Sequence, residues 1–306
     1  MEVLDLIIIG GGPAGLTAAL YGKRAKLNTI LLERSVVGGQ LAYSGVIENY
    51  PGILETKGFE LAQMMEEQVK RLGLEILHEE AVALSRRRRL IDVKTTQSIY
   101  KARSVIIAVG DEPLKLGLEN ERRLIGHGVS YCATCDGPLY AGKTVGVVGG
   151  GDSAVSEALY LASIAKKVHL IHRRDKLRAE KVSSEKLLAK ANVQFEWNSI
   201  VTSLNGRERL ESITVENVRT GETRELAVEG LFIYIGRKPL TGFLTDLEKD
   251  GGGYIKVDQN MQTSLKGVYA AGDCASPKWR QIASAVGDGA KAAISAIKYV
   301  EREFTT

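Results

Sequence analysis

Two stretches of the chain repeat one pattern of apolar and polar positions. In the first stretch, an apolar run at residues 3–9 leads into a glycine-rich turn, a helical pattern at 16–26 and a second apolar run at 29–32. The second stretch has apolar runs at 144–148 and 167–171, separated by another glycine-rich turn and a helical pattern that extends to residue 165. Each copy predicts a strand, a helix and a second strand. The pattern therefore predicts an α/β protein with two Rossmann-like three-layer nucleotide-binding domains.

The segments around these copies indicate how the two domains are connected. We expect a helix at 59–72, strands within 74–107 and 193–235, and a C-terminal helix at 281–301. Proline-containing segments at 111–115 and 236–244 are typical of linkers. The prediction is a domain of residues 114–243 that is inserted into a discontinuous domain of residues 1–113 and 244–306.

The first glycine-rich turn contains Gly10, Gly12 and Gly15, which match the Rossmann fingerprint in its proper place between a strand and a helix. These glycines let the backbone approach a pyrophosphate at the helix N-terminus. Glu33 lies 21 residues after Gly12, at the end of the next predicted strand. A carboxylate at that place accepts hydrogen bonds from ribose hydroxyls, so this turn predicts a site for FAD or NAD.

The second turn has Gly149, Gly151 and Ala154, which form the alanine-ending variant of the fingerprint. The same offset from Gly151 reaches basic residues instead of an acid: His172, Arg173, Arg174 and, one helical turn further, Arg178. A carboxylate would repel a 2′-phosphate, whereas guanidinium groups bind it through charge-assisted hydrogen bonds. The second turn therefore predicts a site for NADP(H) rather than NAD(H).

A third glycine cluster supports FAD in the first domain. Gly272 and Asp273 follow a predicted strand near the C-terminus. The carboxylate of Asp273 is placed to bond a ribityl hydroxyl of the flavin cofactor. The N-terminus of the following helix can face the flavin ring and stabilise negative charge on it.

Cys132 and Cys135 form a CxxC motif, with Asp136 directly after it. Cysteines at this spacing can cycle between dithiol and disulfide with little backbone movement, and a helix beginning here would favour a thiolate. The position between two nucleotide fingerprints indicates an electron path from nicotinamide through flavin to a disulfide. A structural zinc site needs about four ligands, and Cys274 with four scattered histidines supplies no second pair. We expect Cys274 to be a buried, unreactive thiol.

Composition narrows the classes of protein that fit. The 306 residues suffice for two domains, and a net charge of +4 is too mild for a nucleic-acid binder. Three cysteines exclude a disulfide-stapled secreted scaffold. No basic leader precedes the first apolar run, and no apolar stretch approaches the roughly 18 residues that span a bilayer. We expect a cytoplasmic protein without a membrane segment or a metal site. The consecutive Arg86, Arg87, Arg88 and Arg89 are assigned to a solvated hairpin tip.

Taken together, these motifs resemble the bacterial-type, low-molecular-weight thioredoxin reductases over nearly the whole chain. The most specific feature is their order, in which the CxxC lies within the NADPH-binding domain and just ahead of the second fingerprint. The resemblance implies a homodimer with FAD in each chain, electron flow from NADPH to thioredoxin, and a rotation between the two domains that exposes the dithiol. It also implies roles: Cys135 next to the flavin, Cys132 as the thiol that attacks thioredoxin, and Asp136 as the proton donor to a departing thiolate.

The same resemblance extends the two sets of cofactor-binding residues. The FAD set comprises Gly10, Gly12, Pro13, Ala14, Gly15, Glu33, Gly39, Gln40, Leu41, Asn49, Val82, Gly110, Gly272, Asp273, Arg280, Gln281 and Ile282. The NADPH set comprises Gly149, Gly151, Asp152, Ser153, Ala154, His172, Arg173, Arg174, Arg178, Ile235 and Gly236.

Other functions of the same fold remain as alternatives. A flavoprotein with a glutaredoxin-like or small-molecule disulfide as its acceptor would keep the CxxC, although a small-molecule dithiol oxidase has no need of the basic cluster. A ferredoxin-type NADP reductase needs no CxxC, and the flavoprotein of a peroxide-reducing system would carry an additional N-terminal redox domain. A non-catalytic nucleotide sensor would bind both cofactors without thiol-dependent turnover.

Overall fold

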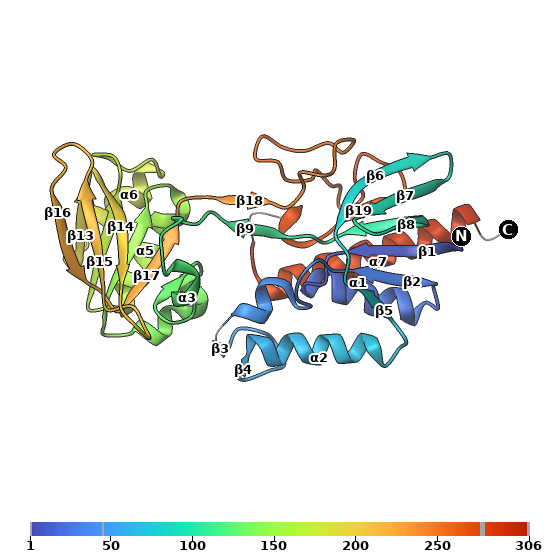
Figure 1. Ribbon diagram of the computed structural model, residues 1–306, viewed down its shortest axis with the longest axis horizontal. Helices are drawn as coiled ribbons and strands as arrows, with labels where there is room; N and C mark the ends of the chain where they lie inside the picture. Colours follow the sequence, from blue (N-terminus) through green and yellow to red (C-terminus); the bar gives the residue numbers. More distant parts are fainter. Residues whose placement is uncertain (1, 45, 276–278, 305–306) are drawn as a thin grey trace. The chain divides into compact units, whose positions relative to one another are not determined.

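The chain folds into two compact units, the second inserted into the first (Figure 1). The structure is a computed structural model that describes residues 2–44, 46–275 and 279–304. One unit comprises Met1–Glu112 and Lys238–Thr306, and the other comprises Pro113–Arg237. Each unit contains a sheet with adjacent parallel strands and the fingerprint turn at the end of a buried strand, so the predicted α/β class with two Rossmann-like domains is confirmed.

The first unit is built on a seven-stranded sheet with the order β5-β2-β1-β8-β7-β6, and β19 also pairs with β8. β1 runs parallel to β2 and β8, whereas β6, β7 and β8 are joined by antiparallel pairing. The strands are β1 (Val3–Ile9), β2 (Thr29–Leu32), β5 (Glu75–Leu77), β6 (Ala81–Arg87), β7 (Leu90–Thr95), β8 (Ile99–Ile107) and β19 (Val268–Ala270). A separate hairpin pairs β3 (Val46–Ile47) with β4 (Thr56–Lys57).

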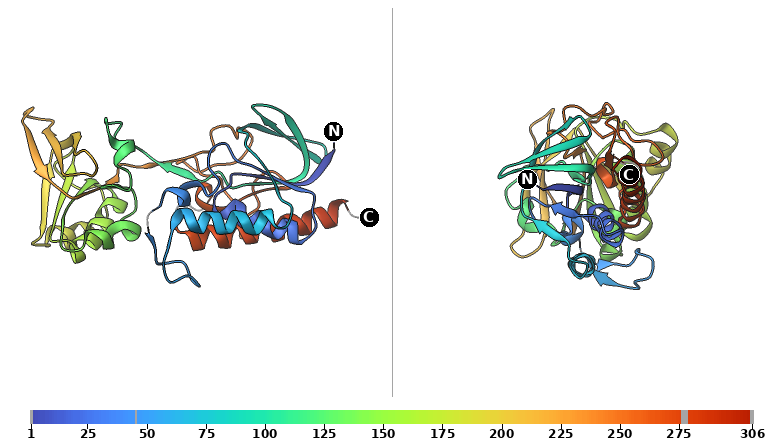
Figure 2. Two further views of the ribbon diagram at one scale, coloured as in Figure 1. Left: turned by 60° about the horizontal axis from the view of Figure 1, so that its bottom comes forward. Right: turned by 90° about the vertical axis from the view of Figure 1, so that its right-hand side faces the viewer.

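Both faces of this sheet are covered, which explains the continuous apolar run of β1. Leu6 and Ile8 pack into the cluster formed with α1 and α7, while Ile7 and Ile9 pack into the cluster on the opposite face. α1 and α7 lie along the same face of the sheet (Figures 1 and 2). The helices are α1 (Pro13–Arg24), α2 (Gly58–Lys70) and α7 (Ile282–Phe304), and the short 3-10 turns are η1 (Gly39–Tyr43) and η3 (Gly272–Cys274).

The second unit has three layers. Its five-stranded parallel sheet has the order β10-β17-β11-β12-β13, and a three-stranded antiparallel sheet, β14-β15-β16, packs on one face. α5 covers the other face through an apolar cluster. The strands are β10 (Val129–Ser130), β11 (Thr144–Gly149), β12 (Lys167–His172), β13 (Val193–Trp197), β14 (Ser199–Asn205), β15 (Ser212–Asn217), β16 (Thr223–Ala227) and β17 (Gly230–Tyr234). The helices are α3 (Glu121–Leu124), α4 (Ala133–Asp136), α5 (Asp152–Ile164), α6 (Lys181–Leu188) and the 3-10 turn η2 (Gly137–Tyr140).

The two connecting segments, β9 (Asp111–Pro113) and β18 (Arg237–Pro239), pair with each other as a short two-stranded sheet. The expected boundary after residue 113 lies one residue beyond the observed one. The expected boundary between 243 and 244 is wrong, because the first unit already begins again at Lys238. The reason is that the Thr241 hydroxyl donates to the carbonyl of Gly253 (2.7 Å) and Leu244 lies in the core of that unit. The proline-containing stretch correctly indicated the linker, but it did not indicate the residue at which the chain packs into the first unit again.

A buried polar network joins the two sheets of the second unit. The Glu196 carboxylate, 1% exposed, contacts His169 Nδ1 at 2.8 Å and also accepts a hydrogen bond from Arg224 of β16. Burial, followed by the charges of Lys167 and Arg224, lowers the pKa of His169 to about 4. His169 is therefore neutral at physiological pH, and the charge of Glu196 is balanced by Arg224.

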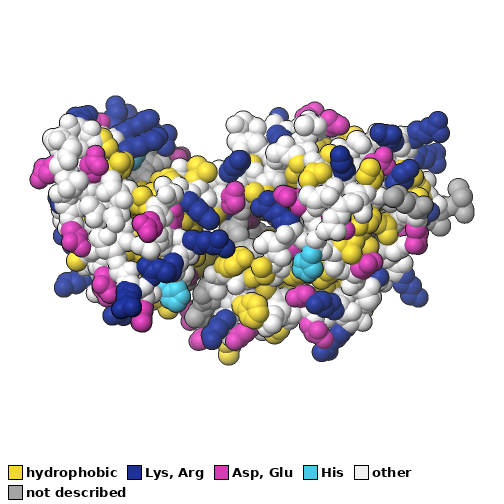
Figure 3. Space-filling model, viewed as in Figure 1, with side chains coloured by type: hydrophobic (Ala, Val, Ile, Leu, Met, Phe, Trp, Pro, Cys, Tyr) yellow, Lys and Arg dark blue, Asp and Glu magenta, His cyan; other side chains and the backbone are white. Residues whose placement is uncertain are grey.

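Among the described residues, no helix is both long enough and apolar enough to cross a membrane. Figure 3 shows side chains of both charges over the drawn face of each unit, with Lys and Arg gathered along the upper edge of the second unit.

Candidate functional site

The first fingerprint turn is a backbone cradle at the start of α1. Gly12 is the N-cap of this helix and Pro13 its first residue, where a fixed φ suits the helix and no N–H is lost. A Cβ on Gly15 would lie 1.9 Å from the carbonyl oxygen of Gly10, so only glycine allows the helix to approach the strand this closely. A Cβ on Gly12 would have nothing nearer than the Gly38 carbonyl oxygen, at 4.0 Å. The open space before the helix N-terminus fits a pyrophosphate.

Glu33 lies beside this cradle, as the sequence predicts. It follows β2 and is buried, and its Oε2 accepts the backbone N–H of Gly11 at 2.7 Å. Its Oε1 accepts the N–H of Ser35 at 2.8 Å. Each carboxylate oxygen keeps a further lone pair, so the oriented group fits the hydroxyls of a ribose.

Contacts within the first unit bring much of the remaining FAD set to the same end of the sheet. Gly39 lies against Gly12, and Gly272 lies against Ala14. The Asn49 amide donates to Gln281 at 3.3 Å, directly before α7, and Ile282 packs against the cluster that contains Leu41. Two further members of the set are Gly110, which directly precedes β9, and Asp273, which lies in η3. Val82 lies in β6, at a register shift in the pairing of this strand with β7.

Arg280 is engaged by a partner that the sequence did not indicate. Its Nε donates to Asp111 Oδ2 at 2.8 Å, and its Nη2 donates to the Tyr254 hydroxyl at 3.1 Å. Asp111 is fully buried in its side chain and begins β9, and Gln40 donates to its carbonyl oxygen. Two expected FAD residues, Arg280 and Gln40, thus hold the first residue of a linker. Their contact with FAD stays a prediction.

The second fingerprint repeats the cradle at the start of α5. Gly151 is the N-cap, and no atom would lie within 4 Å of a Cβ there. Ala154 is buried under the turn, Ser153 is exposed in the first helical turn, and Asp152 accepts the backbone N–H of Glu180 at 2.8 Å. The open N-terminus of a 13-residue helix fits a second pyrophosphate. Ile235 and Gly236 follow β17, whose last residue lies opposite Gly149.

The basic cluster lies where the offset placed it, directly after β12. Arg173, Arg174 and Arg178 are exposed, and none of them forms an ion pair within the part of the chain that the structure describes. The N–H of Arg178 donates to the Gly150 carbonyl at 2.7 Å, which holds the cluster against the fingerprint turn. Three guanidinium groups without a carboxylate partner fit a phosphate ester.

His172 contributes shape to this cluster rather than charge. Its ring packs so close to Gly150 that a Cβ on Gly150 would lie 2.4 Å from Cε1. Burial, followed by the charge of Arg178, lowers the pKa of His172, so the ring is neutral at physiological pH. Its Nε2 is buried without a hydrogen-bond partner among the described residues.

Cys132 and Cys135 are joined in a disulfide within the second unit. Cys132 is the N-cap of α4, a single helical turn, and the N–H of Asp136 donates to the Cys132 carbonyl at 3.1 Å. Both cysteines are half-buried, so a small movement of this turn can present a sulfur to another protein. Cys274, in contrast, is fully buried, and burial raises the pKa of its thiol to about 12. The expected burial of this thiol is confirmed, and its lack of reactivity stays a prediction.

Asp136 lies next to the disulfide with one defined partner. The Ser130 hydroxyl donates to Asp136 Oδ2 at 2.6 Å, and the N–H of Cys132 donates to the same hydroxyl oxygen at 3.1 Å. Burial raises the pKa of Asp136, and the hydrogen bond from Ser130 opposes this effect. A carboxyl group that keeps its proton to higher pH is suited to donate it to a thiolate.

Three residues that hold this turn were not predicted. Tyr131 donates its hydroxyl hydrogen to Glu121 Oε1 at 2.6 Å, and Glu121 also accepts N–H groups from Leu116 and Gly117, just after the first linker. On the other side, the N–H of Ala133 donates to the Tyr234 hydroxyl at 2.6 Å. The sequence contained a hint for only one of the three: Tyr234 directly precedes Ile235 and Gly236, which were predicted to bind NADPH.

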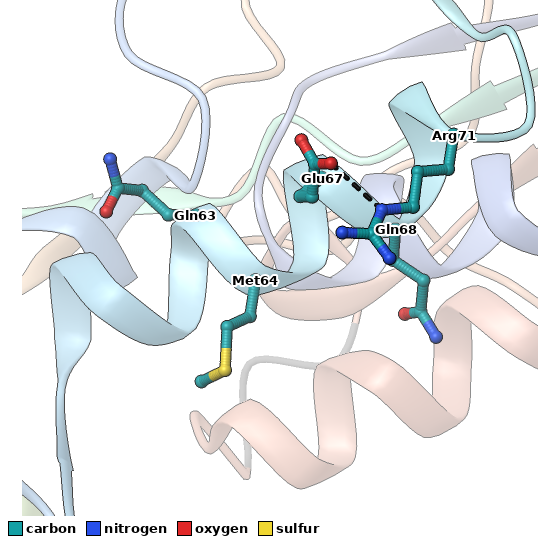
Figure 4. A pocket seen from close by; sticks show the side chains of 5 residues that line it. All are labelled: Gln63, Met64, Glu67, Gln68 and Arg71. Atoms are coloured by element: carbon teal, nitrogen blue, oxygen red, sulfur yellow. Dashed lines mark hydrogen bonds and ion pairs between the residues drawn. The ribbon is translucent and has the colours of Figure 1, made fainter.

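A hollow of about 560 Å³ on the surface of α2 is unrelated to either fingerprint. Its lining comes from the outer face of this helix, where Glu67 and Arg71 form an ion pair with 2.9 Å between Oε1 and Nε (Figure 4). The other lining residues are Gln63, Met64 and Gln68.

The model of the pyridine nucleotide-disulphide oxidoreductase family matches residues 4–289 of the chain. Thioredoxin reductase of Treponema pallidum is 43% identical over 298 residues, with 97% of each chain covered. Thioredoxin reductase of Bacillus subtilis is 43% identical over 302 residues, covering 98% of this chain and 96% of the relative.

Among solved structures, thioredoxin reductase of Streptococcus pyogenes superposes with a TM-score of 0.93 and 41% identity. The match covers 98% of this chain and 99% of that one. The similarity thus extends over both units and includes the CxxC segment.

Proposed function

The chain belongs to the pyridine nucleotide-disulphide oxidoreductase family, and we propose that it reduces the disulfide of a thioredoxin at the expense of NADPH. It is an oxidoreductase that uses FAD and NADPH. The observation that carries the proposal is the Cys132–Cys135 disulfide, which lies in the same unit as the fingerprint with the basic cluster.

The chain's own residues divide into two binding sets. Glu33 and the start of α1 would hold the ribose and pyrophosphate of FAD, and the start of α5 with Arg173 and Arg174 would hold NADPH. When bound, the two cofactors supply an electron pair that passes from the nicotinamide through the flavin to the disulfide. The carboxylate beside one cradle and the guanidinium groups beside the other support this assignment.

The thiol chemistry is assigned to three residues. Reduction breaks the bond between Cys132 and Cys135 and adds two electrons and two protons. The Cys132 thiolate attacks one sulfur of the thioredoxin disulfide, and the departing thiolate takes a proton from Asp136. The Cys135 thiolate then attacks Cys132, which releases the second thioredoxin thiolate for protonation and restores the disulfide.

The two linkers are the proposed hinges of a rotation between half-reactions. They are the segments at which the chain passes between the units, and each carries a proline. We further propose a homodimer in the cytoplasm, as the resemblance implies. Sedimentation analysis of the purified protein tests the dimer directly.

A steady-state assay tests the function. NADPH or NADH is paired with oxidised thioredoxin, a glutaredoxin-like protein or a small-molecule disulfide. We expect the highest kcat/KM for NADPH with thioredoxin. Equal turnover of the small disulfide would favour a small-molecule thiol enzyme, and the absence of thiol-dependent turnover with both nucleotides bound would favour a sensor.

Asp136→Asn tests the proton donor. The raised pKa of Asp136 keeps its proton available to higher pH, and activity should fall as pH rises through that pKa. The variant should reduce thioredoxin about a hundredfold more slowly, since a general acid typically contributes that much or more. The fall in activity at high pH that we assign to Asp136 should also be absent from the pH profile of this variant.

Ser130→Ala is the companion variant. It removes the hydrogen bond that lowers the pKa of Asp136, so its activity should fall at a higher pH than that of the wild-type protein. An Asn variant with an unchanged pH profile would contradict the role.

A further inference from the structure

Tyr234 joins the nucleotide cradle of the second unit to the disulfide turn. It is the last residue of β17 and lies opposite Gly149, the first glycine of the fingerprint. A Cβ on Gly149 would lie 2.5 Å from the Tyr234 carbonyl oxygen. The backbone of Tyr234 therefore packs directly against the loop that is proposed to receive the pyrophosphate.

The side chain of Tyr234 reaches the other site. Its hydroxyl oxygen accepts the N–H of Ala133, between the two cysteines, at 2.6 Å. Ala133 is completely buried and is the first residue of α4, so this N–H has no acceptor within the turn. Loss of the hydroxyl would leave a buried donor without a partner, which disfavours the present conformation of the turn.

The packing around Tyr234 favours the transmission of a backbone shift to its side chain over a local adjustment of that side chain. Phe232 and Ile233, which precede Tyr234 in the strand, are buried on opposite faces of the sheet. Glu157 belongs to α5, the helix that begins at the fingerprint, and its Oε2 is buried without a partner among the described residues. Burial, followed by the charge of Glu157, raises the pKa of the Tyr234 hydroxyl.

We propose that Tyr234 is a positioning residue that couples occupancy of the second fingerprint to the redox equilibrium of the Cys132–Cys135 disulfide. A phosphate that shifts the loop at Gly149 shifts the end of β17, and the hydroxyl passes that shift to Ala133. By linkage, the nucleotide then binds the disulfide and dithiol forms with different affinity. The inference rests on the proposed function only in taking the second fingerprint as the NADPH site.

The test measures the disulfide equilibrium of the whole FAD-loaded protein in dithiothreitol redox buffers. Dithiothreitol transfers two electrons and two protons to the disulfide and itself closes to a cyclic disulfide. The thiols of Cys132 and Cys135 are then counted by maleimide labelling and mass spectrometry. The probe is adenosine 2′,5′-bisphosphate, which carries both phosphates of the adenosine half but no nicotinamide and so exchanges no electrons.

In the wild-type protein, saturating probe should change the equilibrium constant about fivefold, or about 20 mV for a two-electron couple. In Tyr234→Phe the change should fall below about twofold, while calorimetry still detects binding of the probe. Tyr140→Phe is the matched control, because it removes a half-buried hydroxyl that makes no hydrogen bond in the described structure. This control should keep the fivefold change.

Two results would overturn the coupling. One is a disulfide equilibrium of the wild-type protein that does not change when the probe binds. The other is a Tyr234→Phe protein in which the probe still changes that equilibrium about fivefold. The first result is obtained from the wild-type protein alone and needs no variant. Thioredoxin turnover with NADPH is measured on the same preparations. If turnover with thioredoxin is normal but the probe does not change the disulfide equilibrium, this inference fails while the proposed function stands.

Discussion

Cys132→Ser is expected to lower NADPH-dependent thioredoxin reduction by at least about a thousandfold, because it removes the attacking sulfur. The glycine cradles, Glu33 and the basic cluster are untouched by this change. NADPH should therefore still bleach the visible absorbance of the flavin at a rate near that of the wild-type protein. A stopped-flow record of flavin absorbance, beside a steady-state thioredoxin assay, separates the two half-reactions.

The partner variant Cys135→Ser tests the order of the two sulfurs. With Cys135 replaced, the mixed disulfide between Cys132 and thioredoxin cannot be resolved, so a covalent adduct should accumulate and appear in intact mass spectra. Cys132→Ser should form no such adduct. The opposite pattern would reverse the assigned roles, and an active Cys132→Ser protein would refute the dithiol relay.

Cys274→Ala is the matched control for both variants. It also removes a sulfur, but from a fully buried thiol whose pKa is raised to about 12. Thioredoxin reduction should stay within about twofold of wild type, because this thiol is neither accessible nor ionised.

The fold was predictable because both βαβ units are local in sequence. Apolar runs with a glycine turn between them specify a strand, a turn and a helix within about thirty residues. Glu33 and the basic cluster were found for the same reason, since the fingerprint sets their distance along the chain. The end of the second linker was missed because packing of Thr241 and Leu244, rather than composition, decides where the first unit resumes.

The supporting contacts of the site could not be predicted in this way. The hydrogen bond between Ala133 and Tyr234 joins positions that are 101 residues apart in the sequence. The hydrogen bond between Asp111 and Arg280 joins positions that are 169 residues apart. Each depends on the pairing of strands that are distant in the sequence, β10 with β17 and β8 with β19, and no local pattern encodes that pairing. Sequence spacing thus located the groups that touch cofactors, whereas the structure was needed for the groups that position them.

Replacing Arg173 and Arg174 by Gln is expected to abolish the preference for NADPH over NADH. Both side chains are exposed and lack a carboxylate partner in the described structure, so their guanidinium groups are available to a 2′-phosphate. A hydrogen bond to a charged group contributes about 1.5–3 kcal/mol, so losing two should lower kcat/KM for NADPH at least about a hundredfold. NADH carries a hydroxyl at that position, so its kcat/KM should change little.

The matched control is Arg88→Gln with Arg89→Gln, which removes the same two charges from an exposed hairpin in the first unit. A general effect of net charge on a polyanionic nucleotide would appear in this control as well, and we expect none beyond about twofold at physiological salt, because exposed charges are screened over about 8 Å. Both proteins are assayed with NADPH and NADH at saturating thioredoxin. Equal losses for the two nucleotides would refute recognition of the 2′-phosphate, because a contact with the shared pyrophosphate lowers both values together. A loss confined to NADPH assigns the discrimination to Arg173 and Arg174, with His172 shaping the turn as a neutral ring.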